Sequence, residues 1–243
     1  MGFDMSYVIK TFPILLTGLK LTLLLSATSI ILSLIIGISG AVIRTLKLPI
    51  LTQIITIFVE IFRNTPLLVH VFFLYFGLPV IGIKLPAVAV GIITLTLWGG
   101  AYAVENFRGG TNAVQKGLIE SAQSLGLSTF QIVRHIIVPL GFRISFPAFS
   151  NTAVSLIKNS AYMTGIGVAE LTFIAVDRMA YDFKTYEILV SIAVIYLILI
   201  WGTSYLFSRI EKKLDFNNKK PERGSSFEKL RVSIRRVNEN TPS

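Results

Sequence analysis

Polar and ionisable side chains interrupt an otherwise apolar stretch of this sequence at Glu60, Arg63 and Asn64. Ionisable groups are costly at membrane depth, so they indicate either a solute pathway or an internal pair. Glu60 and Arg63 are three residues apart on a predicted helix, where they can neutralise each other. Alternatively, either of them lines a pathway with Asn64 and binds the carboxylate or ammonium group of a substrate.

A second polar group interrupts a later apolar stretch and consists of Lys158, Asn159, Ser160 and Tyr162. It can form part of a substrate site, or it can act as a gate or in helix packing, since Gly165 and Gly167 permit close approach or local unwinding. His70 has no other metal-ligating side chain at suitable spacing, so we expect a hydrogen-bonded core histidine and no metal site.

The longest internal polar segment, residues 105–143, carries signals for two short helices. Residues 115–125 read as a helix with Ile119, Ala122 and Leu125 on one face, and a glycine at position 126 provides a left-handed stop. A Ser128/Gln131 capping box opens a second helix, which we expect Pro139 to end. These two short helices, residues 115–139, form a compact unit called the knob below. The knob can dock into a groove on a partner protein, or it can pack on the chain's own helix ends.

The composition excludes a soluble protein and gives no sign of catalysis. Apolar residues make up 53% and charged residues 15% of the 243 residues, whereas soluble chains carry about 25% charge. The sequence has no cysteine, no nucleotide-binding Walker motif and no nucleophile or carboxylate-pair motif, so no catalytic residue is assigned. The net charge of +10 comes largely from the end of the chain, where ten of the 23 Lys and Arg follow Phe207, so it indicates membrane orientation and no nucleic-acid partner.

Long apolar runs predict an all-α, polytopic membrane protein with five transmembrane helices. The predicted spans are residues 21–43, 50–83, 85–104, 144–174 and 188–207. The excess of Lys and Arg on one side puts the N-terminus outside and the C-terminus in the cytoplasm. We therefore expect an extracytoplasmic segment at 1–16, a transmembrane domain at 17–210 and a basic cytoplasmic tail at 211–243, which is either an amphipathic helix on the lipid surface or disordered.

The polar segment resembles the EAA loop of ABC importer permeases. The matching residues, separated by three and then nine others, are Glu120-Ser121-Ala122, Gly126 and Ile136-Ile137-Val138-Pro139. Three further stretches resemble the polar amino-acid branch of that family: residues 62–69, 102–110 and 158–171. The resemblance covers roughly residues 17–210 and departs from the family pattern at several positions, which include Asn64, His70, Asn159 and Ser160.

The resemblance implies the transmembrane domain of a type I ABC importer, in a prokaryotic inner or plasma membrane. It implies a permease subunit that binds no cofactor itself and docks on ABC ATPase subunits, which hold ATP and magnesium. The remaining implied partners are membrane lipid, a second permease, identical or not, and an extracytoplasmic amino-acid-binding protein. The implied coupling residues are Glu120, Ser121, Ala122, Leu125, Gly126 and Arg134. The rival hypothesis is a self-sufficient secondary transporter or channel for a small solute.

Overall fold

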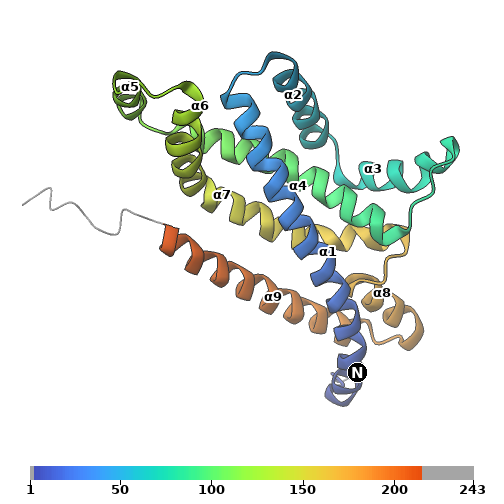
Figure 1. The fold of residues 1–243 in the computed structure, drawn as a ribbon. Helices are drawn as coiled ribbons and strands as arrows, with labels where there is room; N and C mark the ends of the chain where they lie inside the picture. Colours follow the sequence, from blue (N-terminus) through green and yellow to red (C-terminus); the bar gives the residue numbers. More distant parts are fainter. Residues whose placement is uncertain (1–2, 215–243) are drawn as a thin grey trace, which may run out of the picture.

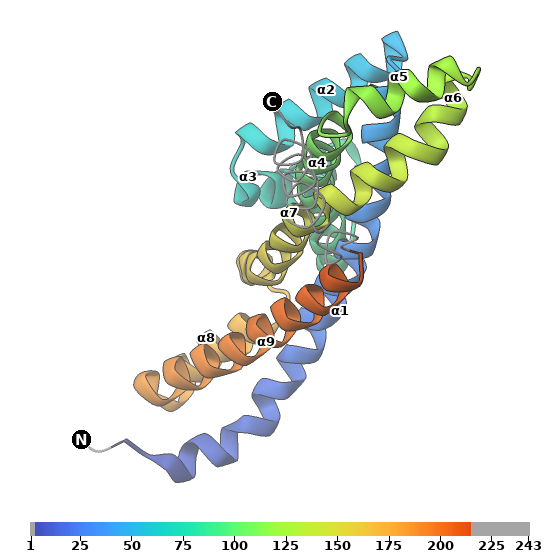
Figure 2. The same ribbon diagram turned by 90° about the vertical axis from the view of Figure 1, so that its left-hand side faces the viewer.

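A computed structural model describes residues 3–214, and every regular element in that range is helical. The α-helices are α1 (Met5–Thr45), α2 (Pro49–Asn64), α3 (Leu67–Phe72), α4 (Ala87–Asn112), α5 (Lys116–Ser124), α6 (Thr129–Ile132), α7 (Val138–Asn159), α8 (Leu171–Asp182) and α9 (Thr185–Leu214). Figures 1 and 2 show α5 and α6 at the opposite end of the molecule from the N-terminus. The predicted tail at 211–243 lies almost entirely outside the described residues.

Four helices are long and apolar enough to cross a membrane: α1, α4, the continuous run Thr129–Ile166, and α9. A fifth candidate is a bent pair, Pro49–Asn64 and Leu67–Ile81, whose halves meet at 107°. The predicted number of spans, five, agrees with the structure when this pair counts as one. Within residues 50–83, predicted as one span, the extended Thr65 and the proline that follows it separate two helices that run in different directions.

Helix α1 begins earlier than the span predicted at residue 21. Asp4 caps it by accepting a 3.0 Å hydrogen bond from the backbone N–H of Tyr7. That bond and the ammonium group of Lys184 lower the pKa of Asp4. Asp182 accepts a 2.6 Å hydrogen bond from the Tyr7 hydroxyl. These contacts tie the start of α1 to the turn between α8 and α9.

Small residues allow the central helices α1, α4 and α7 to pack closely. A Cβ atom added at Gly110 on α4 would lie 1.8 Å from Ser145 Oγ and 2.4 Å from the Gly141 carbonyl oxygen, both on α7. On α1, a Cβ at Gly37 would lie 2.4 Å from the Cβ of Ala103. Small side chains at such crossings let the helix backbones touch, which is how helices associate in membranes.

The helix that starts at Ser128 does not end at Pro139, contrary to the sequence prediction. A single wide turn, Val133–Ile137, joins α6 to α7, and the N–H of Val138 donates to the Val133 carbonyl. Pro139 then occupies the first turn of α7, where its missing N–H does not break the helix. The helix that leaves the knob is therefore the same helix that enters the core.

The predicted span at 144–174 ends sooner than expected. Helix α7 gives way to a tight 3₁₀ segment, Ser160–Ile166, and then to Gly167 with a left-handed φ of 76°. The chain restarts as α8, a separate twelve-residue helix. The helix thus unwinds around the two glycines, and the chain turns away from the direction of α7.

Candidate coupling loop and intramembrane polar groups

The loop between α4 and α7 folds into the compact knob that the sequence predicts. Helix α5 ends at Ser124, and Gly126 follows with φ at 80°, in the left-handed region that favours glycine. The Gly126 N–H donates to the Gln123 carbonyl at 2.9 Å, and the Leu127 N–H donates to the Ala122 carbonyl at 3.2 Å. These bonds satisfy the last carbonyls of α5 and fix the angle at which the chain leaves the helix.

The predicted capping box forms on the second helix of the knob. The Ser128 N–H donates to Gln131 Oε1 at 2.8 Å, and the Gln131 N–H donates to Ser128 Oγ at 3.3 Å. Both bonds satisfy N–H groups that the helix start would otherwise leave unpaired. The knob therefore has a defined conformation on each side of its corner.

The knob has its own small apolar core. Ala122, Ile132 and Val133 are at most 4% exposed and pack together with Val114 and Ile137. Leu125 does not share this face, contrary to the sequence prediction, because it is 80% exposed. Its exposure follows from its position at the helix end, directly before the left-handed turn.

Several side chains of the knob point outward and are free to meet a partner. Glu120, Ser121 and Arg134 are exposed, as predicted for coupling residues, although their role stays a prediction. Leu125 and Phe130 are large apolar side chains that are 80% and 59% exposed. Exposed apolar groups ringed by polar ones are typical of a protein-binding surface.

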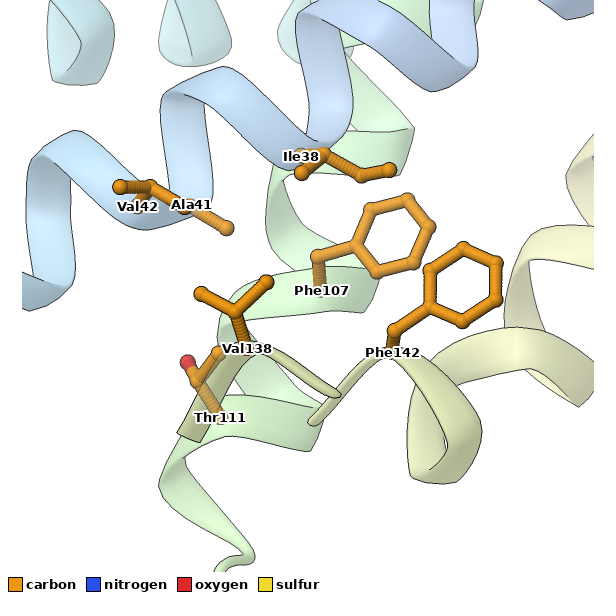
Figure 3. A pocket seen from close by; sticks show the side chains of 7 residues that line it. All are labelled: Ile38, Ala41, Val42, Phe107, Thr111, Val138 and Phe142. Atoms are coloured by element: carbon orange, nitrogen blue, oxygen red, sulfur yellow. The ribbon is translucent and has the colours of Figure 1, made fainter. Parts of the chain in front are cut away.

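The base of the knob joins the three central helices. A small apolar pocket there is lined by Ile38, Ala41 and Val42 of α1, Phe107 and Thr111 of α4, and Val138 and Phe142 of α7. Figure 3 shows that Thr111 carries the only polar side-chain atom among the seven. The rings of Phe107 and Phe142 stack with their centroids 5.6 Å apart. The knob is therefore in direct packing contact with the central helices.

The first intramembrane polar group differs from its prediction. Glu60 does not pair with Arg63; it accepts a 2.6 Å hydrogen bond from the Asn64 amide. Arg63 instead lies 3.9 Å from Glu105 on α4 and over the ring of Tyr102. The i,i+3 spacing of Glu60 and Arg63 could be read from the sequence. Nothing in the sequence indicated that Glu105 on another helix would be the partner of Arg63.

Glu105 is the centre of this group, and sequence analysis gave it no role. Its Oε1 accepts a hydrogen bond from Arg44 of α1, and its Oε2 accepts bonds from Arg108 at 2.7 and 2.9 Å. Its side chain is only 16% exposed. Its place at the start of the polar segment 105–143 gave no signal, because charged residues are common there.

The second polar group divides between buried and exposed positions. Ser160 is fully buried and donates to the Ile157 carbonyl at 2.8 Å, which fits a packing role. Lys158 and Tyr162 are exposed, and Asn159 is half-buried. A Cβ atom at Gly165 would lie 3.3 Å from the Phe72 ring of α3, so this segment lies against the bent pair.

The two histidines lie in different environments. His70 stacks on Phe62 with ring centroids 4.5 Å apart, and its Nε2 is 2.9 Å from Thr65 Oγ1. Its buried Nδ1 has no hydrogen-bond partner. Only one of the two ring nitrogens of His70 is therefore hydrogen-bonded, whereas a fully hydrogen-bonded histidine was expected. His135 is exposed on the knob. Among residues 3–214 there is no group of three or more metal-ligating side chains.

Glu170 is a second carboxylate to which sequence analysis gave no role. It is 0% exposed and caps α8 by accepting from the Phe173 N–H at 2.8 Å. Three hydroxyl groups also donate to its two oxygens, at distances of 2.8 to 3.3 Å; they belong to Thr164, Thr22 and Tyr196. The carboxylate therefore joins α1, α8 and α9.

We expect Glu170→Ala to destabilise the chain strongly. It leaves several buried donors without an acceptor, at a cost of roughly 3 kcal/mol or more. Glu170→Gln keeps one carbonyl oxygen, so its loss should be clearly smaller. Thermal unfolding of the purified variants in detergent measures both effects, with Glu60→Ala as the control at an exposed carboxylate. Wild-type stability of Glu170→Ala would show that the buried bonds contribute nothing.

The chain resembles known transport proteins over most of its length. The family model of binding-protein-dependent transport system inner membrane components matches residues 29–216. The glutamine transport system permease protein GlnP of Escherichia coli K12 is 33% identical over 216 residues, covering 88% of this chain and 99% of that protein. The probable amino-acid ABC transporter permease protein PatM of Vibrio harveyi is 33% identical over 214 residues, covering 87% and 94%.

Solved structures show the same fold. A crystal structure of an amino acid ABC transporter with histidines superimposes with a TM-score of 0.81 at 30% identity, covering 88% of this chain and 100% of that one. An inward-facing structure of the MetNI methionine ABC transporter has a TM-score of 0.71 at 19% identity and the same coverage, and it supports the fold alone.

The helices and the knob thus define the all-α transmembrane domain of a type I ABC importer, a multi-pass membrane protein. Within that class, the chain belongs to the family of binding-protein-dependent transport system inner membrane components. Members of this family are permease subunits without an ATPase of their own.

Proposed function

We propose that this chain is a permease subunit of an ATP-driven amino-acid importer. It forms half of the translocation pathway and couples ATP hydrolysis in a partner ATPase to alternating access. The observation that carries the proposal is the knob: a fixed corner at Gly126, an exposed Glu120 and a helix that runs without interruption into the core. The named substrates of the relatives support an amino acid as solute.

The physical argument is mechanical. A short helix with exposed apolar side chains docks in a groove, and its charged groups set the orientation. Because the chain from Thr129 to Ile166 is one helical run, force applied at the knob reaches the middle of the fold. Packed helices respond to such force by shifting between discrete arrangements. The nucleotide and magnesium would lie in the partner, and this chain would supply the displaced helices.

The proposal also sets the orientation and the other partners. The knob faces the cytoplasm, the N-terminus lies outside, and the membrane is the inner or plasma membrane of a prokaryote. A second permease, identical or not, completes the pathway, and an extracytoplasmic binding protein delivers the amino acid. The candidate pathway residues that are exposed on the isolated chain remain candidates: Glu60, Arg63, Asn64, Lys158 and Tyr162.

Purification through a tag on this chain tests the proposal. We expect an ATPase with a nucleotide-binding P-loop to accompany the chain in mild detergent at about one copy per permease. Glu120→Lys should greatly reduce the amount of that ATPase, because it reverses a charge on the docking surface. Lys116→Gln, on the same short helix, serves as a comparison that removes a charge without reversing one. A chain that purifies without any ATPase and transports solute without ATP would be a secondary transporter instead.

A further inference from the structure

Three guanidinium groups converge on one carboxylate near the knob end of the molecule. Arg44 of α1 bonds one oxygen of Glu105, and Arg108 of α4 bonds the other at 2.7 and 2.9 Å. Arg63 of α2 approaches that second oxygen at 3.9 Å. The three arginines thus come from three different helices and meet at one side chain.

This group carries an excess of positive charge. Three guanidinium groups and one carboxylate give a net charge of +2. Among residues 3–214, Glu105 is the only carboxylate within 4.0 Å of any of the three arginines. Glu60 lies one turn from Arg63 but bonds the Asn64 amide instead. Like charges held this close repel one another, and a further anion would offset that repulsion.

Two of the arginines have donors available for that anion. The side chains of Arg63 and Arg108 are 39% and 43% exposed. The Arg63 guanidinium donates no hydrogen bond to any group among residues 3–214 and lies over the Tyr102 ring, 5.1 Å from its centroid. Both groups reach the same oxygen of Glu105, so they are neighbours. Guanidinium forks placed side by side bind phosphate or carboxylate groups well.

The position of the group favours a phosphate. Arg44 is one residue from the end of α1, and Arg108 lies in the last two turns of α4. Both helices are candidate membrane spans, and the ends of membrane-spanning helices lie at or beyond the lipid headgroups. Basic sites between helix ends are known places for anionic headgroups to bind.

We propose that Arg63 and Arg108, positioned by Glu105 and Arg44, bind an oxyanion, and that this oxyanion is the phosphate of an anionic phospholipid. The site requires only that the long helices lie in a membrane, so it does not depend on the importer function. The α-carboxylate of a transported amino acid has the same binding chemistry. The experiment therefore separates these two sources.

The test uses the complex that contains this chain, reconstituted in phosphatidylcholine nanodiscs with or without phosphatidylglycerol. We expect phosphatidylglycerol to raise the midpoint of thermal unfolding of the wild type by several degrees. The Arg63→Gln/Arg108→Gln chain should lose most of that rise. The control Lys10→Gln/Lys84→Gln removes two exposed cations elsewhere and should keep it. If the Gln variant does not fold, Arg63→Lys/Arg108→Lys keeps the charges and should show a reduced rise.

A parallel arm adds amino acids in the absence of phosphatidylglycerol. A rise produced by an amino acid and abolished in the arginine variants would overturn the lipid as occupant and keep the oxyanion site. No rise with either ligand would overturn the proposal. So would a rise with phosphatidylglycerol that the arginine variants retain in full, because the lipid would then bind elsewhere.

Discussion

The Gly126→Pro chain is expected to reach the membrane in wild-type amount and to lose transport at least tenfold. Gly126 has φ at 80° and donates its N–H to the Gln123 carbonyl. Proline fixes φ near about −65° and has no N–H, so the corner of the knob cannot form. The apolar core of the transmembrane helices does not include this residue, and the chain should still insert.

Gly117→Ala is the matched control for this prediction. Gly117 lies on α5, within the same knob, and a Cβ atom there would meet nothing within 4 Å. Alanine is the better helix former by roughly 1 kcal/mol. Transport should therefore stay at the wild-type level. Membrane-fraction immunoblots and uptake assays on the same cells measure insertion and transport together. Full transport by Gly126→Pro would exclude the knob's corner from the mechanism.

Gly110→Ala should prevent the central helices from packing. The added Cβ would lie 2.4 Å from the backbone carbonyl of Gly141, which cannot rotate away as a side chain can. Helices α4 and α7 would have to separate, at a cost of about 1–3 kcal/mol or more. We expect a clear fall in the midpoint of thermal unfolding and in the yield of monodisperse protein.

The neighbouring Gly109→Ala provides a control of identical chemistry. A Cβ atom there meets nothing within 4 Å, so the substitution should be neutral or slightly stabilising. Opposite results at two adjacent positions would locate the effect at the α4–α7 contact. Equal stability of the two variants would mean that this contact is looser than the structure indicates.

Local signals made the knob predictable from the sequence. A capping box and a glycine stop act within a few residues, so Ser128, Gln131 and Gly126 are where the sequence places them. Apolar runs likewise predicted the membrane class, and a number of spans that agrees with the structure when the bent pair counts as one. The prediction that Pro139 ends the helix failed, because a wide helical turn precedes this proline and the helix continues although Pro139 has no N–H to donate. We identified no signal for such a turn in the sequence.

Long-range polar contacts were not predictable. Arg63 had Glu60 three residues away, but its partner is Glu105 on another helix. Glu170 looked like one more residue of a polar stretch, although the fold buries it among donors from α1, α8 and α9. Sequence spacing shows which groups share a helix face. Only the tertiary arrangement shows which faces meet.

The most direct test of the proposed function is uptake by proteoliposomes that contain the complex purified through this chain. With the binding protein outside, we predict that amino acid accumulates only when ATP and magnesium are enclosed. The Gly126→Pro complex should show no ATP-dependent accumulation. Accumulation by this chain alone, driven by an ion gradient and indifferent to ATP, would contradict the coupling role and favour a secondary transporter.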